Sequence, residues 1–169
     1  SAQVHALTGC TPTLALHVAW DLPGGIRDAA KIRDLEAEHG IRAGSINPNL
    51  FESQEYKFGS ICNPDSAIRR RAIDHLLESV AIAKALRSRD VSLWLADGSN
   101  YPGSQSIRRR IEWMAAALAE VHSELAEDQR LLVDYKPFEP AFYHTDLADW
   151  GMSLLIAREA GDKARVLVD

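Results

Sequence analysis

The sequence predicts an α/β fold that contains five parallel strands. Short apolar runs of the length of buried strands alternate along the chain with longer segments whose apolar residues recur at helical spacing. Each strand except the last is followed by such a helix, an alternation typical of a parallel sheet built from strand–helix units. The 169 residues, with 46% hydrophobic and 25% charged content, suffice for one folded domain covering residues 1–169.

The first half of the chain predicts two strand–helix units. Residues 14–20 form an apolar run, and residues 24–39 follow with helical spacing and end at Gly40, a residue type that commonly terminates helices. Residues 41–46 predict the second strand, which a long loop follows. Asn63, Pro64 and Asp65 then supply a cap and a first-turn proline for the next helix.

The second half of the chain repeats this pattern. The remaining strands are predicted at residues 91–95, 131–133 and 165–169, and the helices between them at 107–125 and 145–160. No strand-to-helix turn carries a glycine-rich phosphate-binding motif, which disfavours a doubly wound nucleotide-binding fold.

Composition and charge exclude several classes of function. The formal net charge of -5 and the scattered basic residues argue against binding to nucleic acid. The arginine triplets 69–71 and 108–110 fall in predicted helices, where we interpret them as solvated faces or ion pairs between elements. Cys10 and Cys62 are too few for a disulfide framework and fit a reducing compartment. With no secretion signal after Ser1 and no apolar span, we expect a cytoplasmic protein that does not contact membranes.

Polar and aromatic residues gather where the predicted strands end. They are His17, Trp20, Asp21, Asn47, Trp94, Asp97, Asp134, Lys136 and Asp169. The carboxyl ends of parallel strands meet at one edge of a sheet, and in a (β/α)8 barrel catalytic residues lie at that edge. The sequence therefore predicts part of such a barrel, with the site at its carboxyl-end mouth.

Asp134 and Asp169 each end an apolar strand, a position where an unpaired carboxylate is costly to desolvate. Two such carboxylates on adjacent strands suit a divalent metal that prefers oxygen ligands, but a salt bridge explains them equally well. Lys136 follows Asp134 by two residues, so the strand period points both side chains the same way. Lys136 is thus either a fixed cation beside a metal ligand or only the charge partner of Asp134.

The other candidate residues also have two interpretations. His17 is either a hydrogen-bonded core histidine or a group that accepts a proton from a substrate hydroxyl. Trp20 and Trp94 either offer flat apolar surfaces to a ligand or pack as core. Residues 143–146 are polar, but capping of the following helix by Thr145 or Asp146 explains them, so we place them outside the site.

Six strings follow one another along nearly the whole chain: HVAWD (17–21), GSINPN (44–49), YKFGS (56–60), LWLADGSNYPG (93–103), DYKPFEPAFY (134–143) and VLVD (166–169). In this order they resemble the bacterial L-rhamnose isomerases of the broad-substrate type, which are xylose-isomerase-like TIM barrels. The resemblance implies that residues 1–169 are an internal piece of such a barrel, containing its second to sixth strands.

The resemblance also implies roles for individual residues. His17 and Lys136 would be catalytic, His17 by assisting ring opening and Lys136 by contacting the substrate near its carbonyl end. Trp20, Phe51 and Trp94 would line the sugar pocket.

The implied metal ligands are Asp134 and Asp169. The resemblance favours Mn²⁺, with Mg²⁺, Co²⁺ or Zn²⁺ as alternatives. The family has glutamate where this chain has Asp134, so ligation by the shorter side chain would need a longer contact, a shifted backbone or a water. Because the given sequence stops before the family's remaining ligands, we expect residues 1–169 alone to be inactive.

The implied reaction interconverts L-rhamnose and L-rhamnulose, an aldose and a ketose, by hydride transfer or through an enediol. The implied partners are a small sugar and, in the intact family, the other subunits of a tetramer. Two alternatives stay open. One is a ketose 3-epimerase of the same superfamily, which needs a pair of glutamates as acid and base, and the other is a non-catalytic barrel fragment.

Overall fold

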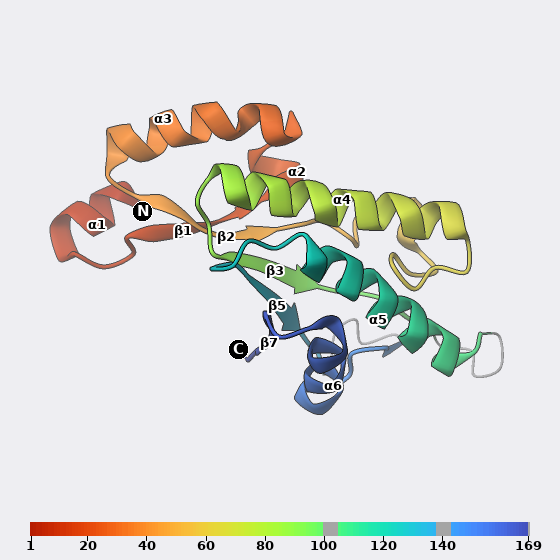
Figure 1. Ribbon diagram of the computed structural model, residues 1–169. Helices are drawn as coiled ribbons and strands as arrows, with labels where there is room; N and C mark the ends of the chain where they lie inside the picture. The colour runs from red at the N-terminus through yellow and green to blue at the C-terminus, as the bar shows by residue number, and fades with distance from the viewer. Residues whose placement is uncertain (100–104, 138–142, 169) are drawn as a thin grey trace.

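The main sheet of the computed structural model has five parallel strands in chain order, as predicted (Figure 1). The structure describes residues 1–99, 105–137 and 143–168. The strands are β1 (Thr13–His17), β2 (Arg42–Asn47), β3 (Asp90–Trp94), β5 (Arg130–Asp134) and β7 (Ala164–Leu167). Two short strands, β4 (Gly98–Ser99) and β6 (His144–Thr145), pair with each other antiparallel.

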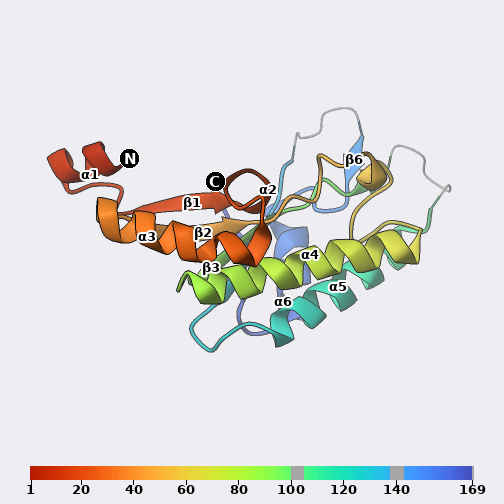
Figure 2. The ribbon, with the colours of Figure 1, turned by 90° about the horizontal axis from the view of Figure 1, so that it is seen from above.

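The helices form a second layer. They are α1 (Ala2–Thr8), α2 (Val18–Asp21), α3 (Ala29–His39), α4 (Ser66–Ala85), α5 (Ile107–Ser123) and α6 (Trp150–Ala160), with 3-10 turns η1 (Gly25–Asp28) and η2 (Gln54–Tyr56). Helices α3 to α6 lie along one face of the curved sheet, and β6 lies at the end of the molecule opposite α1 (Figure 2). Helices on the outer side of a parallel sheet are the arrangement of a (β/α)8 barrel.

None of the helices in the described part of the chain is both long enough and apolar enough to cross a membrane.

Side-chain alternation along the strands separates the helix-facing core from the opposite face. The fully buried residues of β3 and β5 are Val91, Leu93, Leu131 and Val133, and they belong to one core with the apolar residues of α4 and α5. Because successive side chains of a strand point to opposite faces, Trp94 and Asp134 face away from this core. They are neighbours in the register, and Leu167 of β7 follows next to Asp134.

The first strand is shorter than predicted. It ends at His17, and Val18–Asp21 form the short helix α2, in which the Asp21 carboxylate accepts a hydrogen bond from the His17 amide at 2.7 Å. This local bond stabilises a helical turn where hydrophobicity alone predicts a strand. Trp20 therefore lies on a helix. The helix expected at residues 24–39 is divided into η1 and α3, and α1, which buries none of its residues, was not predicted.

Side-chain caps define where the later helices begin. The Asp65 carboxylate accepts from the Ala67 amide at 2.8 Å at the start of α4, as the sequence indicates. Helix α6 begins only at Trp150, and its cap is Asp149, which accepts from the Met152 amide at 2.9 Å. The prediction that Thr145 or Asp146 caps this helix is therefore wrong.

Candidate functional site

A pocket of about 360 Å³ lies at the carboxyl edge of the sheet. Five of the seven predicted site residues line it, namely His17, Phe51, Trp94, Asp134 and Lys136, together with Asn47, Pro48, Ser92 and Leu167. Strand register explains this grouping, because His17 pairs with Asn47 and Trp94 pairs with Asp134 at the ends of their strands. The volume falls within the range of about 300–1,000 Å³ that is usual for small-molecule sites.

Aromatic rings form one wall of the pocket. The Phe51 ring lies between His17 and Trp94, with ring centroids 6.0 Å and 4.6 Å away. Trp20 is not a lining residue but stacks on His17 from α2, with centroids 3.7 Å apart and ring planes 16° from parallel. Its indole nitrogen donates to the Glu52 carboxylate at 3.3 Å, and 61% of the residue is exposed.

His17 offers two ring nitrogens to the pocket. Both are buried, and neither has a hydrogen-bond partner among the described residues. The indole nitrogen of Trp94 is likewise buried without a partner among these residues. The described residues therefore do not show His17 as a hydrogen-bonded core histidine, which was one of its two interpretations. Burial lowers the pKa of His17 below its ordinary value, against the opposing influence of Glu52 and Asp21. A neutral imidazole presents one donor and one acceptor to a ligand.

Asp134 and Lys136 form an ion pair in the lining of the pocket. The Lys136 Nζ atom lies 3.3 Å from Asp134 Oδ2, and the two side chains are 26% and 7% exposed. This contact is compatible with both interpretations of Lys136. The Asp134 carboxylate has the chemistry of a ligand for a hard divalent cation, but it is the one carboxylate among the described residues that line the pocket. Asp169, the other predicted ligand, lies outside the described residues.

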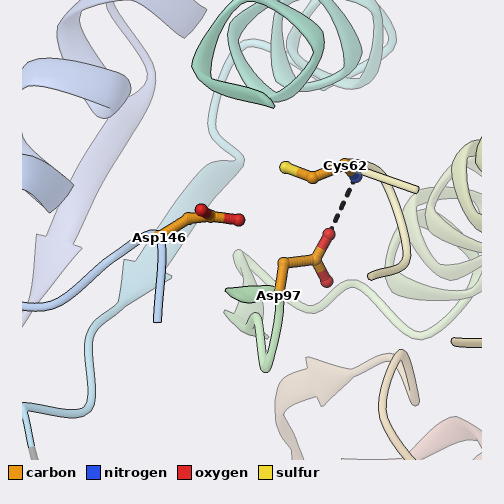
Figure 3. Close-up of side chains that lie close together, drawn as sticks. All are labelled: Cys62, Asp97 and Asp146. Carbon is orange, nitrogen blue, oxygen red and sulfur yellow. Dashed lines mark hydrogen bonds between the residues drawn. The ribbon is translucent and has the colours of Figure 1, made fainter. Parts of the chain in front are cut away.

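A separate cluster of potential metal ligands lies in the loops beyond the strands. Donor atoms of Cys62, Asp97 and Asp146 are all within 4.8 Å of one another, and their side chains approach from three segments of the chain (Figure 3). Asp97 is 1% exposed and already accepts from the Ser60 amide at 2.9 Å, the Ser60 hydroxyl at 2.7 Å and the Cys62 amide at 2.8 Å. Burial nevertheless raises its pKa.

Arg110 supplies the positive charge of this cluster. Its Nε atom donates to both Asp146 oxygens, at 3.1 and 3.0 Å, and its Nη2 atom donates to Asp146 Oδ2 at 2.8 Å. Its Nη1 atom donates to the carbonyls of Phe58 and Cys62, each at 3.2 Å. Burial raises the pKa of the Cys62 thiol well above its ordinary value, so the sulfur stays protonated. The Arg110 guanidinium thus pairs with Asp146, and the cluster joins the loops that follow β2, β3 and β6.

Of the two interpretations of residues 108–110, an ion pair between elements holds for Arg110, which is 1% exposed and pairs with Asp146, whereas a solvated face does not. Helical spacing indicates the burial of Arg110, because it precedes the buried residues Met114 and Leu118 of α5 by four and eight positions and so lies on the same face. In the other triplet, Arg70 pairs with Asp74 and Glu120, as expected for ion pairs on helices.

The fold is that of an α/β protein of the TIM-barrel type, and a pocket lies at the carboxyl edge of its sheet. No protein-family model matches the chain. It is 40% identical over 173 residues to a probable sugar isomerase of Rhizobium meliloti, a match that covers 99% of this chain and 40% of the relative. A probable sugar isomerase of Mesorhizobium japonicum is 38% identical, with 99% and 39% covered. The chain thus spans about 40% of the length of these curated relatives.

Solved structures identify the fold. A D-psicose 3-epimerase from Clostridium cellulolyticum H10, solved with D-tagatose, matches with a TM-score of 0.74 and 13% identity over 98% of this chain and 55% of that structure. A xylose isomerase domain protein from Alicyclobacillus acidocaldarius matches with a TM-score of 0.66 and 15% identity over 98% and 56%. The predicted fold class, part of a (β/α)8 barrel with about five parallel strands and intervening helices, is therefore confirmed.

Proposed function

We propose that this chain supplies the substrate pocket of a metal-dependent aldose–ketose isomerase that interconverts L-rhamnose and L-rhamnulose. The observation that carries the proposal is the pocket that brings His17, Trp94 and the Asp134–Lys136 pair together at the carboxyl edge. The names of the two relatives, both probable sugar isomerases that align over 99% of the chain, support the reaction class.

The lining residues suit a small polyhydroxylated ligand. Phe51 and Trp94 present apolar ring surface to the C–H face of a sugar. His17 has a free donor and a free acceptor for hydroxyl groups among the described residues. The ammonium group of Lys136 stabilises a carbonyl oxygen that gains negative charge during hydrogen transfer between C1 and C2.

A bound divalent ion, Mn²⁺ first and Mg²⁺, Co²⁺ or Zn²⁺ next, would polarise the carbonyl and orient adjacent oxygens. Asp134 is the described pocket residue suited to bind it, and Asp169 is the next candidate. A complete site needs further ligands, so we expect activity from a protein with the full length of the relatives and none from residues 1–169 alone.

The test is an assay of a protein with the full length of the relatives, with L-rhamnose and added Mn²⁺, in which formation of L-rhamnulose is followed by chromatography. We expect a metal-dependent approach to an aldose–ketose equilibrium that chelation abolishes. A parallel assay with D-psicose separates the alternatives. Interconversion with its C3 epimer, without any aldose–ketose exchange, would show a ketose 3-epimerase, and no turnover of either sugar would favour a non-catalytic barrel fragment.

A further inference from the structure

The turn that follows β2 is hydrogen-bonded to helix α4. The Asn49 amide donates to the Nε2 atom of His75 at 2.9 Å, across 26 positions of the sequence. The side chain of Asn49 in turn organises its own loop, because Asn49 Oδ1 accepts from the amides of Phe51 at 3.3 Å and Glu52 at 3.1 Å. Asn49 is thus one point at which this loop is joined to the helix layer, and the Glu55–Arg71 ion pair is another.

Two paths lead from this turn to His17. Phe51 leaves the turn and packs against His17 and Trp94 in the pocket wall. The Glu52 carboxylate accepts from Asn49 Nδ2 at 2.5 Å and from the Trp20 indole at 3.3 Å, and Trp20 stacks on His17. The position of Asn49 therefore fixes a ring on each of two sides of His17.

We propose that His75 is a positioning residue for the pocket, which holds the Asn49 turn and with it the aromatic rings around His17. His75 does not line the pocket and touches none of the reacting atoms that we assign. Its effect on turnover rests on the proposed function, whereas its effect on the turn does not. Nothing in the sequence pattern distinguishes His75 from an ordinary residue of an amphipathic helix.

The hydrogen bond requires one protonation state of His75. Nε2 accepts from an amide, so the ring must be neutral and carry its proton on Nδ1. Burial lowers the pKa of His75 from the ordinary value of 6.5; Glu78 opposes this shift and His17 adds to it. The charged groups that share its two adjoining cavities are Arg27, Glu52, Glu55, Arg71, Asp74 and Glu78.

The pH dependence follows from this lowered pKa. A histidine whose pKa is lower in the folded state contributes stability above its unfolded pKa, and that contribution is lost as the pH falls toward the folded value. The Asn49 turn should therefore be held at neutral pH and released in the acid range below 6.5.

The direct test is a long-range ¹H–¹⁵N NMR spectrum of the chain, which reads the tautomer of each histidine ring. We expect the Nδ1–H tautomer for His75 at neutral pH and an Asn49 amide shift that titrates together with this ring. An Nε2–H tautomer, or an Asn49 amide that does not follow the ring, would overturn the proposal, whatever the protein catalyses.

Two variants separate positioning from general stability. His75→Gln keeps an acceptor near the place of Nε2, whereas His75→Leu removes it. In a catalytically active full-length protein, we expect His75→Leu to lower kcat/KM by about 10- to 100-fold, as for other displaced pocket walls. His75→Gln should keep most of the wild-type kcat/KM, and its kcat/KM should fall less steeply as the pH is lowered. His39→Gln, on the exposed end of α3, is the matched control and should change neither kcat/KM nor its pH dependence. Equal losses in His75→Leu and His75→Gln would refute the positioning role.

Discussion

The contact between Lys136 and Asp134 holds an ammonium group beside a pocket lined mostly by uncharged side chains. Lys136→Ala should lower kcat for sugar isomerisation on the order of 100-fold, because a fixed charge at a developing oxyanion is commonly worth a few kcal/mol. Steady-state kinetics on a full-length protein measure this. Turnover at the wild-type rate would remove the lysine from the mechanism.

The control for Lys136 has to be chosen from the structure. Arg69, which the sequence places on a solvated helix face, is half-buried; its guanidinium lies 4.0 Å from the centre of the Trp113 ring and donates to the Asn63 carbonyl at 2.6 Å. Its removal would disturb the contact between α4 and α5. Lys84→Ala, on the exposed surface of α4, is the better control and should leave kcat unchanged.

Arg110 differs from its neighbours in the same triplet, since it is paired with Asp146 in a buried site. Arg110→Met should lower the free energy of unfolding by roughly 3–5 kcal/mol, because the variant leaves a buried carboxylate without its partner. Arg108→Met, two positions away and exposed, should change it by less than about 0.5 kcal/mol. Urea unfolding of both variants measures the difference, and equal midpoints would contradict the structural role of the pair.

At the scale of single elements, the caps decide where helices begin. Asp149→Ala removes the acceptor for the Met152 amide and should destabilise the protein by about 1 kcal/mol. Asp146→Asn should affect stability through its ion pair with Arg110 and not through the start of α6, because Asp146 belongs to the Arg110 cluster. Thermal unfolding followed by circular dichroism compares the two variants, and an unchanged midpoint in Asp149→Ala would show that the cap contributes nothing.

Elements with strong local signals were predictable from the sequence. The Asn63-Pro64-Asp65 start and the regular apolar spacing of α4 predict that helix within a few residues. Residues 18–20 were predicted as strand but lie in α2, where the Asp21 carboxylate accepts from the His17 amide, a bond that hydrophobic periodicity cannot reveal. The start of α6 was misplaced for a similar reason, because a two-residue pairing of β6 with β4 occupies Thr145.

The residue pattern alone predicts the strand-borne part of the candidate site, whereas Phe51 was named only through the family resemblance. His17, Trp94 and Asp134 end strands, and the rule that parallel strands carry sites at their carboxyl ends places them together. The supports of the site were not predictable in this way. His75 binds Asn49 across 26 positions and Arg110 binds Asp146 across 36, and no short-range pattern encodes either contact.

At the scale of the whole molecule, the described sheet is open. Strands β1 and β7 each have one hydrogen-bonded neighbour in it, and Trp150 and Leu155 of α6 are 60% and 57% exposed. Open edges and exposed apolar side chains favour association. Residues 1–169 in isolation should therefore self-associate or be marginally stable. Sedimentation velocity and urea unfolding test this, and a monomer with a sharp, cooperative transition would contradict it.

The buried cluster around Arg110 also predicts how related sequences diverge. The guanidinium balances Asp146 and binds two carbonyls in a site that excludes water, so losing one partner leaves a costly charge behind. A lineage that replaces the arginine with an apolar residue should therefore replace Asp146 as well. These two positions, 36 residues apart, should covary across an alignment, whereas Arg108 and Asp149 should drift independently of each other.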